Sequence, residues 1–224
     1  MMPDRFWQKE IMEDCRSKKA LAMKFLLPLL LLSPLALGHV PDHIRAWILS
    51  MSVLFTGTFG SAVGLAQIRE SKMLEKLAVM PVSPRRIIAD YMMASMLMDG
   101  LQLMVPFVLV ARLTVSHLPV AMACYVAALV ASSALGVIVA VMAGSSAEVH
   151  LYAALAVLVS GALSSPIVTY EPLRYLNMAW PFWQLSNALV GAGSSSQAAL
   201  ALISAVSLFY LAMIASVRLF RPRN

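Results

Sequence analysis

The sequence predicts an all-α polytopic membrane protein that forms a single domain over residues 1–224. Hydrophobic residues make up 60% of the chain and charged residues only 12%, about half the charged fraction of an average soluble domain. Apolar runs of about twenty residues recur along the chain, which is the length that a helix needs to cross a bilayer. A water-facing surface of ordinary size cannot be built from this composition, so most of the surface is expected to face lipid.

Six apolar runs are predicted to be transmembrane helices. They cover about 20–37, 46–66, 87–110, 118–143, 149–168 and 198–217. Residues 3–19 mix aromatic with charged side chains and are predicted to form an amphipathic helix in the membrane interface, with a disordered charged leader as the alternative. Residues 169–197 form an outer segment with a group of aromatic residues, Trp180, Phe182 and Trp183, and an interfacial or partly re-entrant helix pair is expected there.

The distribution of basic residues predicts the orientation. Thirteen of the 17 Lys and Arg residues fall before the first span, in the 67–86 loop or after the last span, whereas the segments on the other side hold three. The positive-inside rule therefore predicts a protein of the cytoplasmic membrane with both termini in the cytoplasm. This asymmetry accounts for the net charge of +6, and nucleic acid is not an expected partner.

The loop 67–86, QIRESKMLEKLAVMPVSPRR, is the only long charged stretch between two apolar runs. Read as a helix, it places Leu74 and Leu77 on one side. Pro81 and Pro84 are expected to stop this helix, because each lacks a backbone donor and restricts the residue before it. The pattern predicts a short amphipathic helix on the cytoplasmic side, between the second and third spans.

This loop resembles the cytoplasmic loop of ABC type-2 transporter permeases. The resemblance rests on Arg69-Glu70, on Leu74-Glu75-Lys76-Leu77 and on Pro81-Val82-Ser83, while Lys72-Met73 stand where Gly-Thr is usual in the family. It implies a coupling helix that docks on a separate ATP-hydrolysing subunit. The residues expected to dock are Glu70, Met73, Leu74, Glu75, Leu77, Pro81 and Ser83.

The resemblance implies the transmembrane permease subunit of an ATP-driven exporter. Two ATP-binding subunits would bind ATP and Mg²⁺, so this chain would hold no cofactor. A second copy of the chain or a related permease would complete the pathway, because six spans are too few to enclose one in this family. Two alternatives remain open: a membrane component for cytochrome c maturation from the same superfamily, and a non-transporting channel or scaffold.

Catalysis by this chain is not expected. No glycine is followed by lysine, so the chain lacks a phosphate-binding loop. A serine-protease interpretation of Gly60-Ser61 would need a histidine facing the serine from another span, and the last span contains none. His39, Asp42 and His43 superficially resemble metal ligands, but Pro41 breaks the helical register between them. Residues 39–45 are therefore predicted to form a solvated outer turn, and no metal site is expected.

One acidic residue falls in the middle of a predicted span. Asp99 lies roughly 18 Å along the third span at 1.5 Å per residue, where an aspartate costs about 2.5–3.5 kcal/mol. Ser95, Asp99 and Gln102 fall at helical spacing and form a polar stripe. The stripe predicts either a lining of the substrate path or of the seam between subunits, or hydrogen bonds that hold helices together.

Small residues recur at helical spacing in two spans. Gly60 and Gly64 form such a pair in the second span, and Ser132, Gly136 and Ala140 form a stripe in the fourth. Small side chains let helix backbones approach closely within a membrane. Both patterns therefore predict helix packing and not chemistry.

Overall fold

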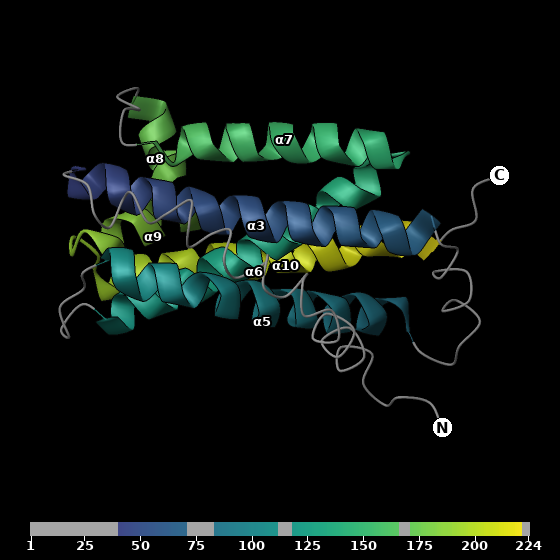
Figure 1. Ribbon diagram of the computed structural model, residues 1–224, viewed down its shortest axis with the longest axis horizontal. Helices are drawn as coiled ribbons and strands as arrows, with labels where there is room; N and C mark the ends of the chain where they lie inside the picture. The colour runs from purple at the N-terminus through teal and green to yellow at the C-terminus, as the bar shows by residue number, and fades with distance from the viewer. Residues whose placement is uncertain (1–39, 71–82, 112–117, 166–170, 221–224) are drawn as a thin grey trace.

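The computed structural model describes residues 40–70, 83–111, 118–165 and 171–220 (Figure 1). These ranges are almost entirely helical and contain no strand. The elements are α3 (Asp42–Glu70), α5 (Pro84–Ala111), α6 (Leu118–Met142), α7 (Ser146–Leu163), α8 (Glu171–Ala179), α9 (Pro181–Leu189), α10 (Ser195–Ser216) and the 3₁₀-helix η1 (Val217–Phe220). The helices expected at 3–19 and 20–37 and the loop residues 71–82 lie outside the described residues.

Five of the described helices, α3, α5, α6, α7 and α10, are long and apolar enough to cross a membrane. The prediction of an all-helical membrane protein is confirmed, while the sixth span stays a prediction. Figure 1 shows the five helices side by side along the long axis of the molecule. At one end, here called the loop end, α3 ends and α5 begins; α8 and α9 lie at the opposite end.

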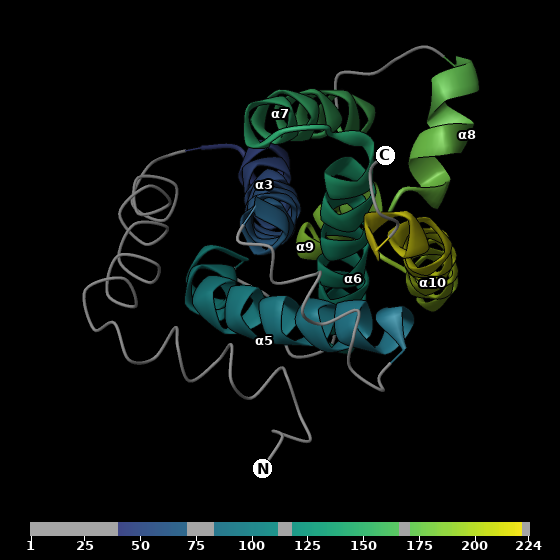
Figure 2. The same cartoon turned by 90° about the vertical axis from the view of Figure 1, so that its right-hand side faces the viewer.

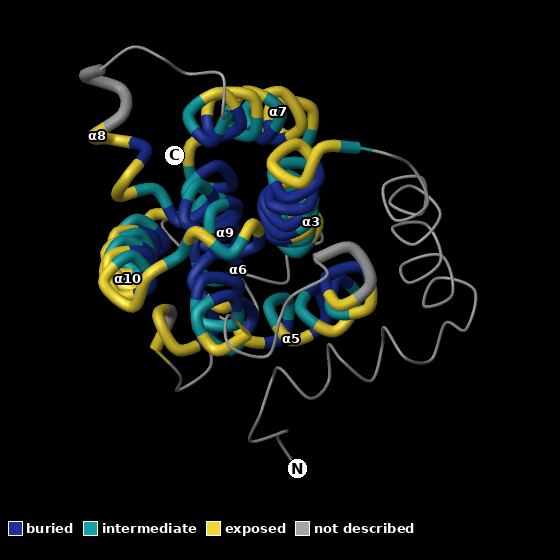
Figure 3. The backbone as a smooth tube through the Cα atoms, turned by 90° about the vertical axis from the view of Figure 1, so that its left-hand side faces the viewer, coloured by how far each residue is buried: buried dark blue, intermediate teal, exposed yellow. Residues whose placement is uncertain are grey.

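Helix α6 lies at the centre of the bundle, with α3, α5, α7 and α10 around it (Figure 2). Its sequence is rich in alanine, serine and glycine, and most of these small residues are buried (Figure 3). A helix surrounded on all sides cannot carry long side chains everywhere without forcing its neighbours apart. Small residues therefore suit the central position, because association in a membrane depends on close van der Waals contact.

The tightest packing is between α6 and α3. A Cβ added at Gly136 would lie 2.7 Å from the Thr58 carbonyl oxygen and 3.0 Å from the Ala62 amide nitrogen, both backbone atoms of α3. In the same seam the Thr58 hydroxyl donates a hydrogen bond of 3.3 Å to the Ser132 carbonyl. The predicted small-residue packing is confirmed here, and it brings two helix backbones into near contact.

Large apolar side chains on α5, α7 and α10 are exposed, and Figure 3 shows exposed positions along the outer sides of these helices. Leu97 and Leu101 on α5, Leu158 on α7, and Ile203 and Val206 on α10 are examples, each more than two-fifths exposed. Apolar surface of this extent is unusual on a soluble monomer. In a bilayer it is the expected outer face of the bundle, because lipid chains cover it.

The segment between α7 and α10 contains two short helices. Helix α9 packs against both α3 and α6, and its Phe182 and Leu185 are fully buried in the same cluster as Leu49 of α3. Pro181 begins this helix, where its missing N–H would have no partner anyway. Helix α9 therefore forms part of the core at the end opposite the loop end, and the interfacial or partly re-entrant placement of the α8–α9 pair stays a prediction.

Two helices begin at places where the sequence predicted turns or stops. Helix α3 begins at Asp42, inside the predicted outer turn, because the Pro41 carbonyl accepts hydrogen bonds from the Ile44 and Arg45 amides. Helix α5 begins at Pro84, which was expected to stop a helix. Proline restricts the backbone of the residue before it, so it disfavours a helix that would continue into it. At the first position of a helix its missing N–H costs no hydrogen bond, so a helix can begin there.

Candidate functional site

A buried polar cluster lies between α3 and α5, halfway along the bundle. The Ser95 hydroxyl donates a 3.1 Å hydrogen bond to a carboxylate oxygen of Asp99, and the hydroxyls of Ser61 and Ser95 are 3.1 Å apart. Ser61 is fully buried and Asp99 is 9% exposed. We call Ser61, Ser95 and Asp99 the central polar cluster.

Small residues and tyrosines surround this cluster. Gly60 adjoins Asp99, since a Cβ added there would lie 3.8 Å from both carboxylate oxygens. The Tyr91 hydroxyl donates to the carbonyls of Gly60 and Ser61, at 3.4 Å each. The Tyr125 hydroxyl donates to the Gly100 carbonyl at 2.8 Å, so α6 contacts α5 immediately after Asp99. Three helices therefore place hydrogen-bonding groups around one carboxyl group.

The predicted stripe of Ser95, Asp99 and Gln102 lies on α5, and its Ser95 adjoins Ser61 of α3. Ser95 and Asp99 are hydrogen-bonded, and Gln102, about one turn further along α5, is partly buried. Ser61 was considered in the sequence only as a nucleophile and was rejected. No sequence signal identifies it as a partner of Ser95, because 34 residues separate the two and only the packing of α3 on α5 brings them together.

A second group of polar contacts lies at the loop end, where Arg69 meets the C-terminus of α6. One guanidinium nitrogen of Arg69 donates to the carbonyls of Ala140 (3.1 Å) and Ala143 (2.9 Å). The last carbonyls of a helix have no partner within it and carry partial negative charge. Arg69 therefore caps α6 from the end of α3.

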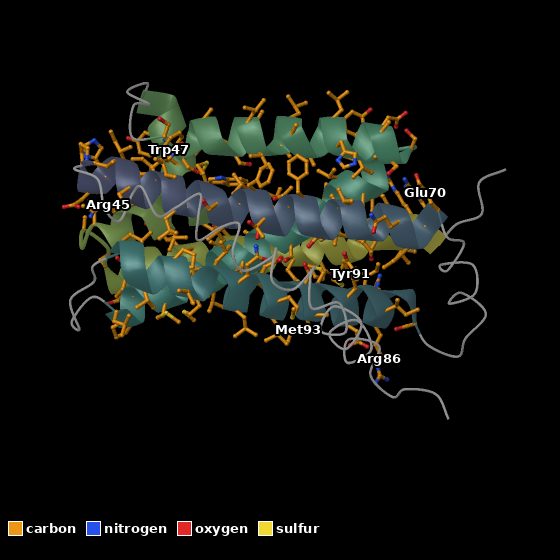
Figure 4. All side chains as sticks on the ribbon, viewed as in Figure 1. Arg45, Trp47, Glu70, Arg86, Tyr91 and Met93 are labelled. Carbon is orange, nitrogen blue, oxygen red and sulfur yellow. The ribbon has the colours of Figure 1, made fainter. Side chains whose placement is uncertain are left out.

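The next residue binds the N-terminus of the following helix. A carboxylate oxygen of Glu70 accepts a 3.1 Å hydrogen bond from the Ser146 amide in the first turn of α7, and Figure 4 shows Glu70 at the end of α3. Helix N-termini favour negative charge. We call Arg69, Glu70 and the α6–α7 turn (143–146) the turn junction.

The residues expected to dock on a partner have different positions in this structure. Glu70 binds the α6–α7 turn, and Ser83 precedes α5, where its carbonyl accepts from the amides of Arg86 and Ile87. Both residues thus bind within the chain. Met73, Leu74, Glu75, Leu77 and Pro81 lie outside the described residues, so their docking role stays a prediction.

We expect replacement of Arg69 by alanine to lower the free energy of unfolding by about 1–2 kcal/mol. Hydrogen bonds to charged groups contribute about 1.5–3 kcal/mol, and a somewhat smaller value is expected here because Arg69 is only partly buried, so that water can partly replace the guanidinium. Tryptophan fluorescence during denaturation of the purified protein measures the change. Arg85→Ala, which removes an exposed arginine at the same end, is the matched control. Equal stability of the two variants would contradict the capping role.

The acidic groups of the two clusters do not form a cluster of metal ligands within the described residues. Among the described residues, no group of three or more His, Cys, Asp or Glu is placed to hold a metal ion. The central polar cluster offers hydroxyl donors and a carboxyl group to a polar partner, and the turn junction connects α3 to α6 and α7. Comparison of the sequence with protein-family models and with curated proteins finds no match.

Proposed function

We propose that this chain is the transmembrane permease subunit of an ATP-driven exporter of the ABC type-2 family, acting in the cytoplasmic membrane. The composition and the apolar helices support a membrane role, and the resemblance of the 67–86 loop supports the family. The main structural support is the turn junction. It connects the last turn of α3, which carries Arg69-Glu70 of the family pattern, to α6 and α7 through three hydrogen bonds.

This connection suggests how a partner could act on the bundle. A displacement applied to residues 71–82 would reach the end of α3 first. Through Arg69 and Glu70 it would then reach α6 and α7. Ser61 of the central polar cluster lies on the same helix, and its contacts with α5 would change when α3 moves. The seam between α3 and α5, with Asp99 in it, is therefore the proposed element that responds to ATP.

The partners follow from this proposal. Two ATP-binding subunits would dock on the 67–86 loops of two permeases and would bind ATP and Mg²⁺. The second permease would be another copy of this chain or a related one. Both termini would lie in the cytoplasm, and membrane lipid would cover the exposed faces of α5, α7 and α10.

Isolation of the complex tests the proposal. The chain is purified from its native membranes in mild detergent; one portion is labelled with a photoreactive ATP analogue, and a second, unlabelled portion is reconstituted in lipid for the hydrolysis assay. We expect a stoichiometric nucleotide-labelled subunit and ATP hydrolysis that depends on the permease. Purification of the chain without such a subunit, together with passive ion flux, would favour the channel or scaffold. Haem-dependent stimulation of hydrolysis would favour the cytochrome c maturation alternative.

Asp99→Asn tests the central polar cluster. The asparagine carbonyl can still accept the Ser95 hydrogen bond, so we expect the variant to assemble with stability within about 0.5 kcal/mol of the parent. Loss of the titratable carboxyl group is expected to change the pH profile of permease-dependent ATP hydrolysis. Ser95→Ala is the control: it keeps the carboxyl group and should cost about 0.6 kcal/mol, the mean for hydrogen bonds between membrane helices.

Two results would contradict this assignment. Failure of Asp99→Asn to assemble would mean that the negative charge itself holds the helices together. An unchanged pH profile in an assembled Asp99→Asn complex would leave the cluster with a structural role only.

A further inference from the structure

Three exposed arginines meet at the loop end of the bundle. Arg85 and Arg86 lie in the first turn of α5, and Arg218 lies in η1, directly after α10. Leu219 of η1 packs against the cluster that contains Ile88 of α5, so η1 lies beside the start of α5. Figure 2, viewed from this end, shows the start of α5 next to α10. We call Arg85, Arg86 and Arg218 the arginine rim.

The charges of the arginine rim are not neutralised within the described chain. The ion pair that the described residues form joins Arg45 to Asp42, at the end of the bundle opposite the rim. Asp90, one turn after Arg86, is the nearest acidic residue along α5, and it forms no ion pair with Arg86. Among the residues that the structure describes, the guanidinium groups of the rim therefore have no acidic partner, and they are exposed to a ligand.

Apolar surface continues directly from the rim. The side chains of Arg86 and Met93 point from the same side of α5, away from the other helices (Figure 4). Leu97 and Leu101 follow Met93 at four-residue intervals, which keeps them on that side of the helix, and all three are exposed. On α10, Leu211 and Ile214 are exposed in the last turns before η1. Three guanidinium groups thus lie at the end of two exposed apolar surfaces.

This geometry points to an acidic phospholipid bound at the loop end, with its phosphate on the arginine rim and its acyl chains along the exposed faces of α5 and α10. Guanidinium groups match phosphate oxygens with paired donors. A net negative headgroup is favoured over a zwitterionic one, because the amine of the latter already neutralises its phosphate. A protein partner is less well matched, since the apolar faces that continue from the rim are those that lipid chains cover. This inference goes beyond the proposed function and does not depend on transport.

Native mass spectrometry of the full-length protein in detergent tests the inference. The protein is titrated with dioleoyl-phosphatidylglycerol or dioleoyl-phosphatidylcholine, and the bound lipids are counted. We expect the acidic lipid to bind at least about tenfold more tightly. Each arginine near an acidic headgroup contributes about fivefold to affinity, so R85Q/R86Q/R218Q should lose about a hundredfold and bind both lipids equally.

Two control variants separate this site from general charge effects. Arg174→Gln removes one charge from α8, at the end opposite the rim, and should leave affinity unchanged, whereas Arg86→Gln should lose about fivefold. The triple lysine variant keeps the charge but loses the paired donors, and it should bind with intermediate affinity. The melting temperature of each variant shows that it is folded.

Several outcomes would overturn the inference. Equal affinity of the parent for the two lipids would do so, as would full affinity for the acidic lipid in the triple glutamine variant. Full competition by glycerophosphoglycerol, which has the headgroup but no acyl chains, would exclude the apolar faces from the site. If the triple glutamine variant bound lipid normally but failed to co-purify with a nucleotide-labelled subunit, the rim would be a protein-docking surface instead.

Discussion

Replacement of Leu77 by aspartate is expected to abolish co-purification of the ATP-binding subunit while leaving the membrane protein intact. Leu74 and Leu77 lie on one side of the predicted amphipathic helix, and a helix this short is marginal in water without packing. Burial of one leucine in a groove of the partner would contribute about 1.5–3 kcal/mol. Aspartate removes this contribution and adds the cost of burying a carboxylate. Each 1.4 kcal/mol lost lowers affinity about tenfold, so a loss of at least a hundredfold is expected.

Two variants make this result interpretable. Leu77→Met preserves apolar character and approximate volume and should co-purify like the parent. Glu75→Ala removes a charge beside the apolar side, so it should retain most of the binding but couple ATP hydrolysis to transport less well. Membrane insertion is expected to be unchanged in all three, because the loop lies outside the apolar helices. Full co-purification and activity of Leu77→Asp would exclude this loop as the coupling element.

Hydropathy was sufficient to predict the class of the fold. Long apolar runs need a nonpolar environment on most sides, and that requirement depends on composition alone. The depth of α9 in the bundle was not predictable in this way. Its nine residues are too few for a transmembrane pattern, and its burial depends on the packing of Phe182 and Leu185 against side chains of α3 and α6.

In the candidate sites, neighbours within one helix could be predicted from the sequence, whereas neighbours on different helices could not. The spacing of Ser95 and Asp99 predicted that they would share a side of α5, because four residues nearly complete a helical turn. Ser61 could not be predicted as their neighbour, since it belongs to another helix. Glu70 was expected to face a partner protein, and the structure places it against Ser146 of this chain. A charged residue at a helix end forms hydrogen bonds with the backbone groups that pack beside it. The sequence alone does not show which backbone groups these are.

Alanine substitutions at two glycines should have opposite effects, although both glycines lie in adjoining apolar helices. At Gly136 of α6, a Cβ would lie 2.7 Å from the Thr58 carbonyl oxygen and from the Ser61 Cβ. At Gly60 of α3, a Cβ would find only the carboxylate of Asp99, at 3.8 Å, an ordinary contact. Backbone atoms cannot rotate out of the way as the end of a flexible side chain can. Gly136→Ala must therefore separate α3 from α6, whereas Gly60→Ala needs no rearrangement.

We expect Gly136→Ala to lower the free energy of unfolding by about 1–3 kcal/mol, the usual cost of forcing extra volume into a packed core. Gly60→Ala should leave it unchanged or raise it by up to about 1 kcal/mol, because alanine has the higher helix propensity. Separation of the helices would also lengthen the hydrogen bond from Thr58 to the Ser132 carbonyl. Denaturation of the two variants in the same detergent, followed by tryptophan fluorescence, gives the comparison. If Gly136→Ala proved as stable as Gly60→Ala, the α3–α6 seam could not be as closely packed as the structure has it, and the route from the turn junction to the centre of the bundle would be looser than proposed.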